Sequence, residues 1–410
     1  MIHIILREKL SSALVLVPQV GNLTTDVNFW GTPEQLSEQN MPRPAYMVYT
    51  RDGTADLASS IATALASGSM ALRSQNASYS QQLMTTATSL YNEAKAYPGL
   101  YTSGLKYSCT SRFSKANVGT AQGAQACPPP TDFANGTAAY FYNSTGYWDD
   151  LIFAAGWMFQ ATNDSSYMAD VNSFYASYNS EEAPTDVGFI TDYNHVFQAA
   201  NVLLAVASND VWYHQTVQTM LQNWICALGG TTAFTPQGRA WNPLAPTTGD
   251  TGNVAFLAAV YGQFHSTSIS AAQSDRYICF ARSQMRYILG DKTNSLMVGN
   301  GVKSPTHAQN RAASCPNPPT VCNADDALYV STPNPHVLTG AVVEFATFSD
   351  NYQDVRTSND SRVSITNNAG ITGTMAGLVK APGTWDSCLQ GFGVLTGSGG
   401  VCKAGNVVSA

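Results

Sequence analysis

The chain has 410 residues, a length that allows one large domain or two, and no stretch has the composition of a linker, so we expect one domain. Only 11% of the residues are charged, and the formal net charge is −7. The sequence shows no basic patch and no apolar run near the ~20 residues of a membrane span. We therefore expect neither nucleic acid nor a membrane as a partner.

The sequence predicts about nine helices, because apolar residues recur at helical spacing in segments of roughly four to five turns. The first follows Thr54, a potential N-cap, and places Leu57, Ile61 and Leu65 four residues apart. The others cover residues 83–97, 151–159, 168–174, 196–204, 217–224, 254–261, 278–288 and 371–378. Very short turns at 162–164 and 208–210 are typical of helical hairpins. Strand patterns are rare, so the predicted fold class is all-α.

Sequons and cysteines indicate a secreted glycoprotein. Six Asn-x-Ser/Thr sequons occur, at Asn22, Asn76, Asn135, Asn143, Asn163 and Asn359. Of the eight cysteines, six lie in short-range pairs that predict the disulfides Cys109–Cys127, Cys315–Cys322 and Cys388–Cys402. Cys226 and Cys279 lie in helical patterns and are either buried free thiols or a fourth bridge. Charges at residues 7–9 interrupt the apolar start, so no signal peptide is evident, and we expect it to have been lost with the N-terminus.

Several segments have a characteristic order and spacing. Near the C-terminus they are Pro335-His336-Val337-Leu338-Thr339-Gly340-Ala341-Val342, Ser349-Asp350-Asn351-Tyr352-Gln353-Asp354-Val355-Arg356 and Asn367-Asn368-Ala369-Gly370. Further blocks lie at residues 43–46, 142–151 and 283–291. Together they resemble the family 9 glycoside hydrolases, the endoglucanase family, over most of the chain.

The resemblance implies an (α/α)6 toroid of six helical hairpins, incomplete here with about nine of its twelve helices. It assigns residues 43–382 to the barrel domain, 1–42 to a loop-rich remnant of the N-terminal region and 383–410 to a disulfide-containing tail. It also implies an inverting endo-β-1,4-glucanase that hydrolyses cellulose and requires no cofactor. We expect a monomer.

The catalytic positions depart from the family pattern. The family's general acid is a glutamate six residues before Asn368, where this chain has Arg362. An arginine keeps its proton near neutral pH and cannot protonate a leaving group. Asp360 is the candidate substitute, although the adjacent sequon favours an exposed loop there. The Asp-Ala-Gly-Asp base motif is not found, and Asp56, one of the few N-terminal acids, falls where a helix is expected to start.

The resemblance also suggests ligand-binding residues. The family's His-His-Arg corresponds to Gln309-Asn310-Arg311, and Arg311 could hold sugar hydroxyls through its directed donors. Aromatic rings that could stack on glucose, although each alone is more often a core residue, are Phe141, Tyr142, Trp148, Trp241 and Tyr352. A structural calcium ion would use Thr145, Gly146, Asp149 and Asp150 with Asn194 or His195, and the alternative is that the two aspartates only favour a helix start.

Three functional hypotheses follow. The first is an endoglucanase acting on β-glucan whose hydrolysis is weak or absent because of Arg362 and the missing base. The second is a non-catalytic β-glucan-binding protein that keeps the groove. The third is a fragment of a longer, active enzyme.

Overall fold

The computed structural model describes residues 14–38, 45–104, 106–108, 142–183, 189–226, 232–264, 268–291 and 294–381. The predicted disulfides Cys109–Cys127 and Cys388–Cys402, the sequon at Asn135 and the ring of Phe141 lie outside these residues. The chain forms two compact units. Unit 1 comprises Met1–Phe29, Glu38–Asp186 and Tyr193–Leu203, and unit 2 comprises Trp30–Ser37, Val187–Asp192 and Leu204–Ala410.

The predicted helices are confirmed. Within the described residues, nine helices have twelve residues or more, and each predicted segment falls on one of them. They are α3 (Ala55–Leu72), α4 (Ala77–Ala96), α8 (Trp148–Thr162), α9 (Ser166–Glu181), α10 (Phe197–Ser208), α11 (Val211–Cys226), α12 (Thr248–Gly262), α13 (Ala271–Leu289) and α15 (Ile365–Leu378). None of the helices in the described part of the chain is long and apolar enough to cross a membrane.

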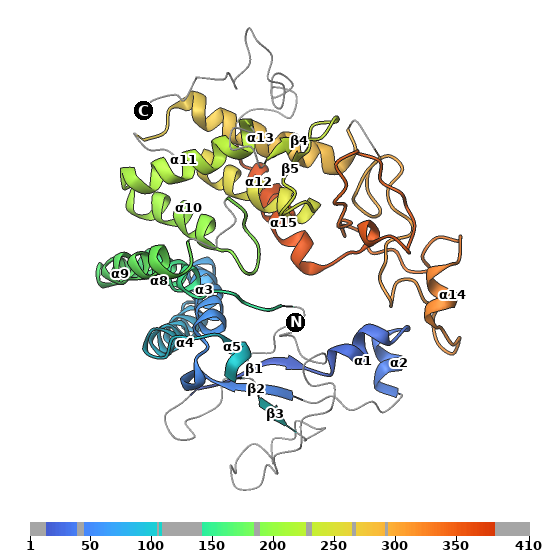
Figure 1. The fold of residues 1–410 in the computed structure, drawn as a ribbon, viewed down its shortest axis with the longest axis horizontal. Helices are drawn as coiled ribbons and strands as arrows, with labels where there is room; N and C mark the ends of the chain where they lie inside the picture. Colours follow the sequence, from blue (N-terminus) through green and yellow to red (C-terminus); the bar gives the residue numbers. More distant parts are fainter. Residues whose placement is uncertain are drawn as a thin grey trace. The chain divides into compact units, whose positions relative to one another are not determined.

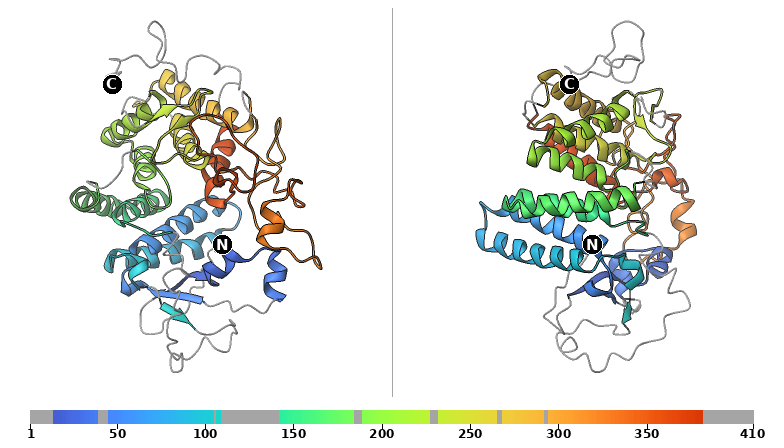
Figure 2. Two further views of the ribbon diagram at one scale, coloured as in Figure 1. Left: turned by 45° about the vertical axis from the view of Figure 1, so that its right-hand side comes forward. Right: turned by 60° about the vertical axis from the view of Figure 1, so that its left-hand side comes forward.

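Unit 1 is built on two helical hairpins, α3–α4 and α8–α9, which lie side by side through α3 and α8 (Figures 1 and 2). Ala55, Ala58, Ala62 and Ala66 recur on the buried side of α3, and small side chains allow close helix packing. The turn between α8 and α9 is closed by Asn163, which adopts the left-handed conformation (φ 59°) that asparagine tolerates well. The predicted hairpin turn at 162–164 is therefore confirmed.

A small antiparallel sheet completes unit 1, and the sequence did not predict it. Its strands follow the order β1 (Val15–Val20), β2 (Ala45–Tyr49) and β3 (Lys106–Ser108), with Val15 opposite Tyr49 and Val20 opposite Ala45. Short helical segments flank it, namely α1 (Leu23–Asn28), η1 (Thr50–Asp52) and α5 (Tyr101–Gly104). The region expected to be a loop-rich remnant thus contains regular structure.

Unit 2 is centred on α12, which packs against α13 on one side and α15 on another (Figure 1). Its core joins these helices to the 296–298 and 342–345 segments through Ile278, Met285, Leu296, Val342, Phe345 and Ile371. The smaller elements are α2 (Pro33–Glu38), α14 (Ala324–Leu328), η3 (Asn359–Ser361) and the hairpin of β4 (Ala233–Phe234) and β5 (Ala240–Trp241). Long loops between α13 and α15 carry most of the signature residues.

The described cysteines are all in disulfides. The predicted bridge Cys315–Cys322 is confirmed. Cys226 and Cys279 are also disulfide-bonded, which excludes the alternative that they are buried free thiols.

Candidate functional site

The signature segments of unit 2 are tied together by asparagine side chains at the start of α15. Ser364 caps this helix by accepting a hydrogen bond from the Asn367 backbone N–H. The Asn367 Nδ2 donates to the Val342 carbonyl at 2.8 Å. The Asn368 side chain accepts from the Val342 N–H at 2.9 Å and donates to the Gly340 carbonyl at 2.8 Å. The third signature segment therefore holds the first one in place.

Arg362 is exposed and lies two residues before the N-cap of α15. Its Nε donates a hydrogen bond to the Gln309 Oε1 at 3.1 Å. The backbones of the two residues form a short parallel bridge, in which the Gln309 N–H donates to the Ser361 carbonyl at 2.7 Å. The family's acid position and its first cleft histidine position are thus adjacent, and both carry residues that cannot act as general acids.

Arg311 lies close enough to Arg362 for their charges to interact. Burial, and then the positive charge of Arg362, lower the pKa of the Arg311 guanidinium. Its guanidinium carbon lies 5.8 Å from the centroid of the Trp30 ring, and its buried Nε has no hydrogen-bond partner in the described part of the chain. The predicted ligand-binding arginine is therefore half-buried against an aromatic face. The sequence did not single out Trp30; the only signal was a tryptophan in the Gly-Thr-Pro loop before α2.

The acids nearest the lost glutamate are engaged in ordering the backbone. Asp360 accepts from the Ala346 N–H at 3.0 Å through Oδ1 and from the Thr347 hydroxyl at 2.9 Å through Oδ2. Glu344 accepts from the Ser364 hydroxyl at 2.6 Å. A catalytic role for Asp360 stays a prediction, and its present contacts hold the 346–347 segment.

The second signature segment is joined to neighbouring segments by side-chain hydrogen bonds of Asp350, Asp354 and Arg356. Asp350 accepts from the Gln237 N–H at 2.7 Å and from the Tyr287 hydroxyl. Asp354 accepts from the Thr306 N–H at 2.8 Å and lies 3.1 Å from the His307 Nδ1, and these hydrogen bonds lower its pKa although burial opposes them. The Arg356 side chain, 3% exposed, donates to the carbonyls of Ala327, Val330 and Thr332 and to the Asn334 side chain.

The predicted aromatic residues differ in exposure. The Trp241 Nε1 donates to the Ala346 carbonyl at 2.7 Å, and its ring meets Phe348 edge-on at 5.1 Å. Phe348, 41% exposed, was not predicted, because a phenylalanine in a Ser/Thr-rich loop has no distinctive pattern. Tyr352 is only 9% exposed and packs against Phe345, and its hydroxyl contacts Asp354 and Ser361.

In unit 1, the predicted Tyr142 is exposed and forms an edge-on pair with Tyr193, which is also exposed and was missed. Trp148 lies in the first turn of α8, where its Nε1 donates to Glu181 at 2.8 Å. The role of these rings in sugar binding stays a prediction.

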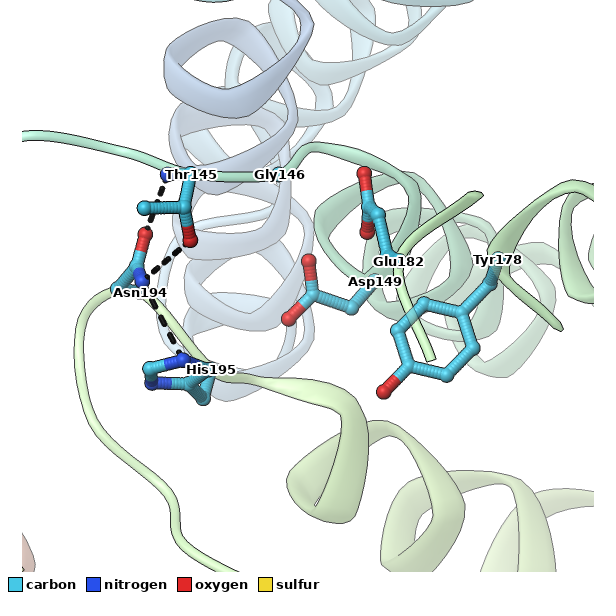
Figure 3. Close-up of a pocket in the computed structure, with 7 residues that line it drawn as sticks. All are labelled: Thr145, Gly146, Asp149, Tyr178, Glu182, Asn194 and His195. Carbon is cyan, nitrogen blue, oxygen red and sulfur yellow. Dashed lines mark hydrogen bonds between the residues drawn. The ribbon is translucent and has the colours of Figure 1, made fainter. Parts of the chain in front are cut away.

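A pocket of about 30 Å³ lies in unit 1 at the start of α8 (Figure 3). It is lined by Thr145, Gly146, Asp149, Tyr178, Glu182, Asn194 and His195. All of the residues predicted to bind calcium except Asp150 are therefore brought together, including both alternatives, Asn194 and His195. Asp150 does not line the pocket and instead accepts from the Ser60 hydroxyl at 2.9 Å. Glu182 was not predicted.

The two carboxylates of the pocket are held by backbone N–H groups. Asp149 accepts from the Val196 N–H at 2.8 Å. Glu182 accepts from the Tyr147 N–H at 2.7 Å and the Trp148 N–H at 3.0 Å, at the N-terminus of α8, where the helix dipole favours negative charge. An added Cβ at position 146 would lie 2.6 Å from the Glu182 Cδ, so a larger residue there would require the Glu182 carboxylate to move.

Burial raises the pKa of Asp149 to about 7, and it also raises the pKa values of Asp150 and Glu182. The negative charge of Asp149 raises the pKa of Asp150 further, and the charge of Glu182 raises the pKa values of both aspartates, because like charges repel. Carboxylate, amide and hydroxyl oxygens suit calcium by type. However, Thr145 and Asn194 bond to each other at 2.8 Å, and no group of three or more Asp, Glu, His or Cys in the described residues is arranged to hold a metal. A cation here would depend on two carboxylates and on neutral oxygens.

Helical hairpins together with these signature segments define an (α/α)6 glycoside hydrolase. The chain belongs to glycosyl hydrolase family 9, whose family model matches residues 5–375, and by family it is a glycoside hydrolase.

Its relatives include several endoglucanases. Endoglucanase 24 of Oryza sativa subsp. japonica is 28% identical, with 91% of this chain and 68% of the relative covered. Endoglucanase A of Bacillus pumilus is 29% identical, with 91% and 51% covered. This chain thus spans about half of the bacterial relative and about two thirds of the rice relative.

Solved structures agree on the fold. The endoglucanase of the termite Nasutitermes takasagoensis matches with a TM-score of 0.72 and 29% identity, over 89% of this chain and 73% of that one. Endoglucanase CelQ from Clostridium thermocellum, complexed with cellotriose, matches with a TM-score of 0.69 and 27% identity, over 89% and 53%.

Proposed function

We propose that the chain binds β-1,4-glucan as a member of the endoglucanase family and hydrolyses it weakly or not at all. The observation that carries this proposal is Arg362 at the family's acid position, hydrogen-bonded to Gln309. Inverting hydrolysis needs a carboxylic acid to protonate the leaving oxygen and a carboxylate to activate water. A guanidinium does neither at neutral pH, since it holds its protons and cannot accept one.

Retained binding is supported by the ring pair of Trp241 and Phe348 and by the directed donors of Arg311. Flat rings bind the apolar faces of glucose, and a few polar groups fix its orientation. CelQ, a structural relative, was crystallised with cellotriose. A β-glucan chain is therefore the ligand class that we infer for this protein.

The test combines turnover and binding. Purified protein is incubated with carboxymethylcellulose, and we expect no reducing-end release above that of a heat-inactivated sample. Calorimetric titration with cellotetraose should show binding, and Phe348→Ala should weaken it several-fold, since an exposed ring contact contributes about 1 kcal/mol. Tyr329→Ala, which removes another exposed ring of unit 2, should leave binding unchanged. Robust hydrolysis would overturn the proposal of weak or absent catalysis. A folded chain that does not bind cellotetraose would overturn the proposal of glucan binding.

We also propose that calcium, when bound, is held at the start of α8 by Asp149 and Glu182 with oxygens of Thr145, Gly146 and Asn194. Its role there would be to neutralise the buried carboxylates and fix the loop before α8. Calcium should raise the melting temperature of the protein but not that of Asp149→Asn. An equal rise in both proteins would place the ion elsewhere.

A further inference from the structure

We propose that the paired guanidinium groups of Arg311 and Arg362 bind an anionic substituent, a carboxylate or a sulfate ester, on a sugar chain. The inference rests on the proposed function and narrows its ligand from β-glucan in general to an acidic glucan. A family 9 cleft would otherwise present a carboxyl group at position 362, so the sign of the charge at this position is reversed.

The Arg362 side chain is oriented but not neutralised. Its Nε bonds to the neutral Gln309 Oε1 at 3.1 Å, and that bond fixes the plane of the guanidinium. No other side-chain hydrogen bond and no ion pair is formed by Arg362 with the rest of the chain that the structure describes. Its exposed Nη groups are therefore available to a ligand.

Arg311 presents a second set of donors beside the first, because Gln309, two residues before it, pairs with Arg362 through the backbone. The Trp30 ring holds it from one side at 5.8 Å, and its buried Nε lacks a partner among the described residues. The positive charge of Arg362 lowers the pKa of the Arg311 guanidinium, and no carboxylate contributes an opposite effect. Two guanidinium groups that repel each other, one half-buried at Arg311 and one exposed at Arg362, create a site that an anion would stabilise.

Neither Asp360 nor Glu344 forms an ion pair with either arginine in the described part of the chain. Asp360 has both oxygens bonded to Ala346 and Thr347, and Glu344 accepts from Ser364. The formal net charge of the chain is −7, so this pair of positive charges is not simply part of a generally basic surface. A guanidinium fork matches the two oxygens of a carboxylate or a sulfate ester, and Gln309 can add a neutral amide donor to the same group.

The experiment compares three ligands of equal length by calorimetry: neutral cellotetraose, cellotetraose oxidised to carboxylate at C6, and cellotetraose sulfated at C6. At low salt we expect at least one anionic ligand to bind about tenfold more tightly than the neutral one. The preference should fall several-fold at 300 mM NaCl, because salt screens exposed charges over about a Debye length. The tighter of the two anionic ligands identifies the substituent. Equal binding of all three ligands would overturn the proposal.

Variants assign the preference to the pair. Arg362→Gln should abolish the preference for anions while neutral cellotetraose binds as before, and Arg362→Lys should keep only part of it because a lysine lacks the fork. Lys380→Gln, an exposed position, removes the same charge and should keep the whole preference. An unchanged preference in Arg362→Gln, or an equal loss in Lys380→Gln, would contradict the assignment. If neutral cellotetraose fails to bind but an anionic ligand binds through Arg362, the glucan proposal fails and the anion site stands. If neither kind of ligand binds the folded protein, both fail.

Discussion

Asp56 illustrates how burial acts on a single carboxyl group. It lies in the first turn of α3 and is 5% exposed. Its Oδ1 accepts from the Leu57 N–H at 2.8 Å and from the Tyr101 N–H at 3.0 Å, whereas its Oδ2 has no partner in the described residues. Burial raises its pKa from 3.8 to about 6, although the backbone hydrogen bonds oppose the change.

This carboxyl group should make unit 1 less stable as the pH rises. Between pH 3.8 and about 6 the unfolded chain loses the proton while the folded chain keeps it, so the free energy of unfolding falls with pH and levels off above that range. A pKa difference of this size corresponds to about 3 kcal/mol. Asp56→Asn removes the titration, so its unfolding free energy relative to the wild type should rise by about 2 to 3 kcal/mol between pH 4 and pH 7 in urea denaturation. A constant difference across this range would show that Asp56 does not titrate as described.

Single residues were predictable where a motif located them. The order of the signature segments was sufficient to single out Arg362, Gln309 and Arg311, and the structure brings the three together. Trp30 and Phe348 could not be found in this way, because their importance comes from neighbours distant in the sequence. Trp30 meets Arg311 and Phe348 meets Trp241 only after folding.

At the scale of elements, α12 and α15 pack almost backbone to backbone. Glycines on both helices make this possible: Gly249 and Gly252 on α12, and Gly370 and Gly373 on α15. A Cβ at Gly370 would lie 2.5 Å from the Asn253 backbone nitrogen and 2.6 Å from its Cα. The glycine of the third signature segment is therefore required for helix packing.

Gly370→Ala should destabilise unit 2 by about 2 kcal/mol, since overpacking against a backbone typically costs about 1 to 3 kcal/mol. Gly377→Ala is the matched control in the same helix, because its Cβ would come no closer than 3.4 Å to another atom and alanine favours the helix by up to about 1 kcal/mol. Denaturant melts of both variants test this contrast. Should Gly370→Ala fail to fold, Gly373→Ala provides a milder case, because its Cβ would meet the Phe256 ring rather than backbone. Equal stability of all the variants would refute the close contact.

The helices were predictable and the small sheet was not, for a physical reason. Each long helix packs one side against its neighbours, so its apolar period can be found within a single continuous segment, as at Leu57, Ile61 and Leu65, of which Ile61 is buried and the two leucines are half-buried. Strand β1 is short, contains Pro18 and has an irregular register between Leu16 and Gln19, which disrupts the alternation of apolar and polar residues. Its partner strand begins only at Ala45, too far along the chain to be inferred from a local pattern.

At the scale of the whole molecule, the sequons differ in the exposure of their asparagines. Asn76, Asn143 and Asn163 of unit 1 and Asn359 of unit 2 are exposed. Asn22 is half-buried, and its side chain caps α1 by accepting from the Thr25 N–H at 3.0 Å. Attachment of a bulky glycan needs a free approach to the side-chain amide, so these sites should not be modified equally.

Secretion from a eukaryotic host should therefore give high occupancy at Asn143, Asn163 and Asn359 and the lowest occupancy, among the described sequons, at Asn22. Peptide mapping after enzymatic deglycosylation measures each site separately. Ser165→Ala is a suitable control, because it removes the Asn163 sequon while keeping the asparagine whose left-handed backbone closes the α8–α9 turn. This variant should lose one glycan and keep its melting temperature within about 1 °C, since an exposed substitution without a structural role changes stability little. Full occupancy of Asn22 together with an unmodified Asn163 would contradict the described exposure of both residues. An unglycosylated product would contradict the prediction of a glycosylated surface.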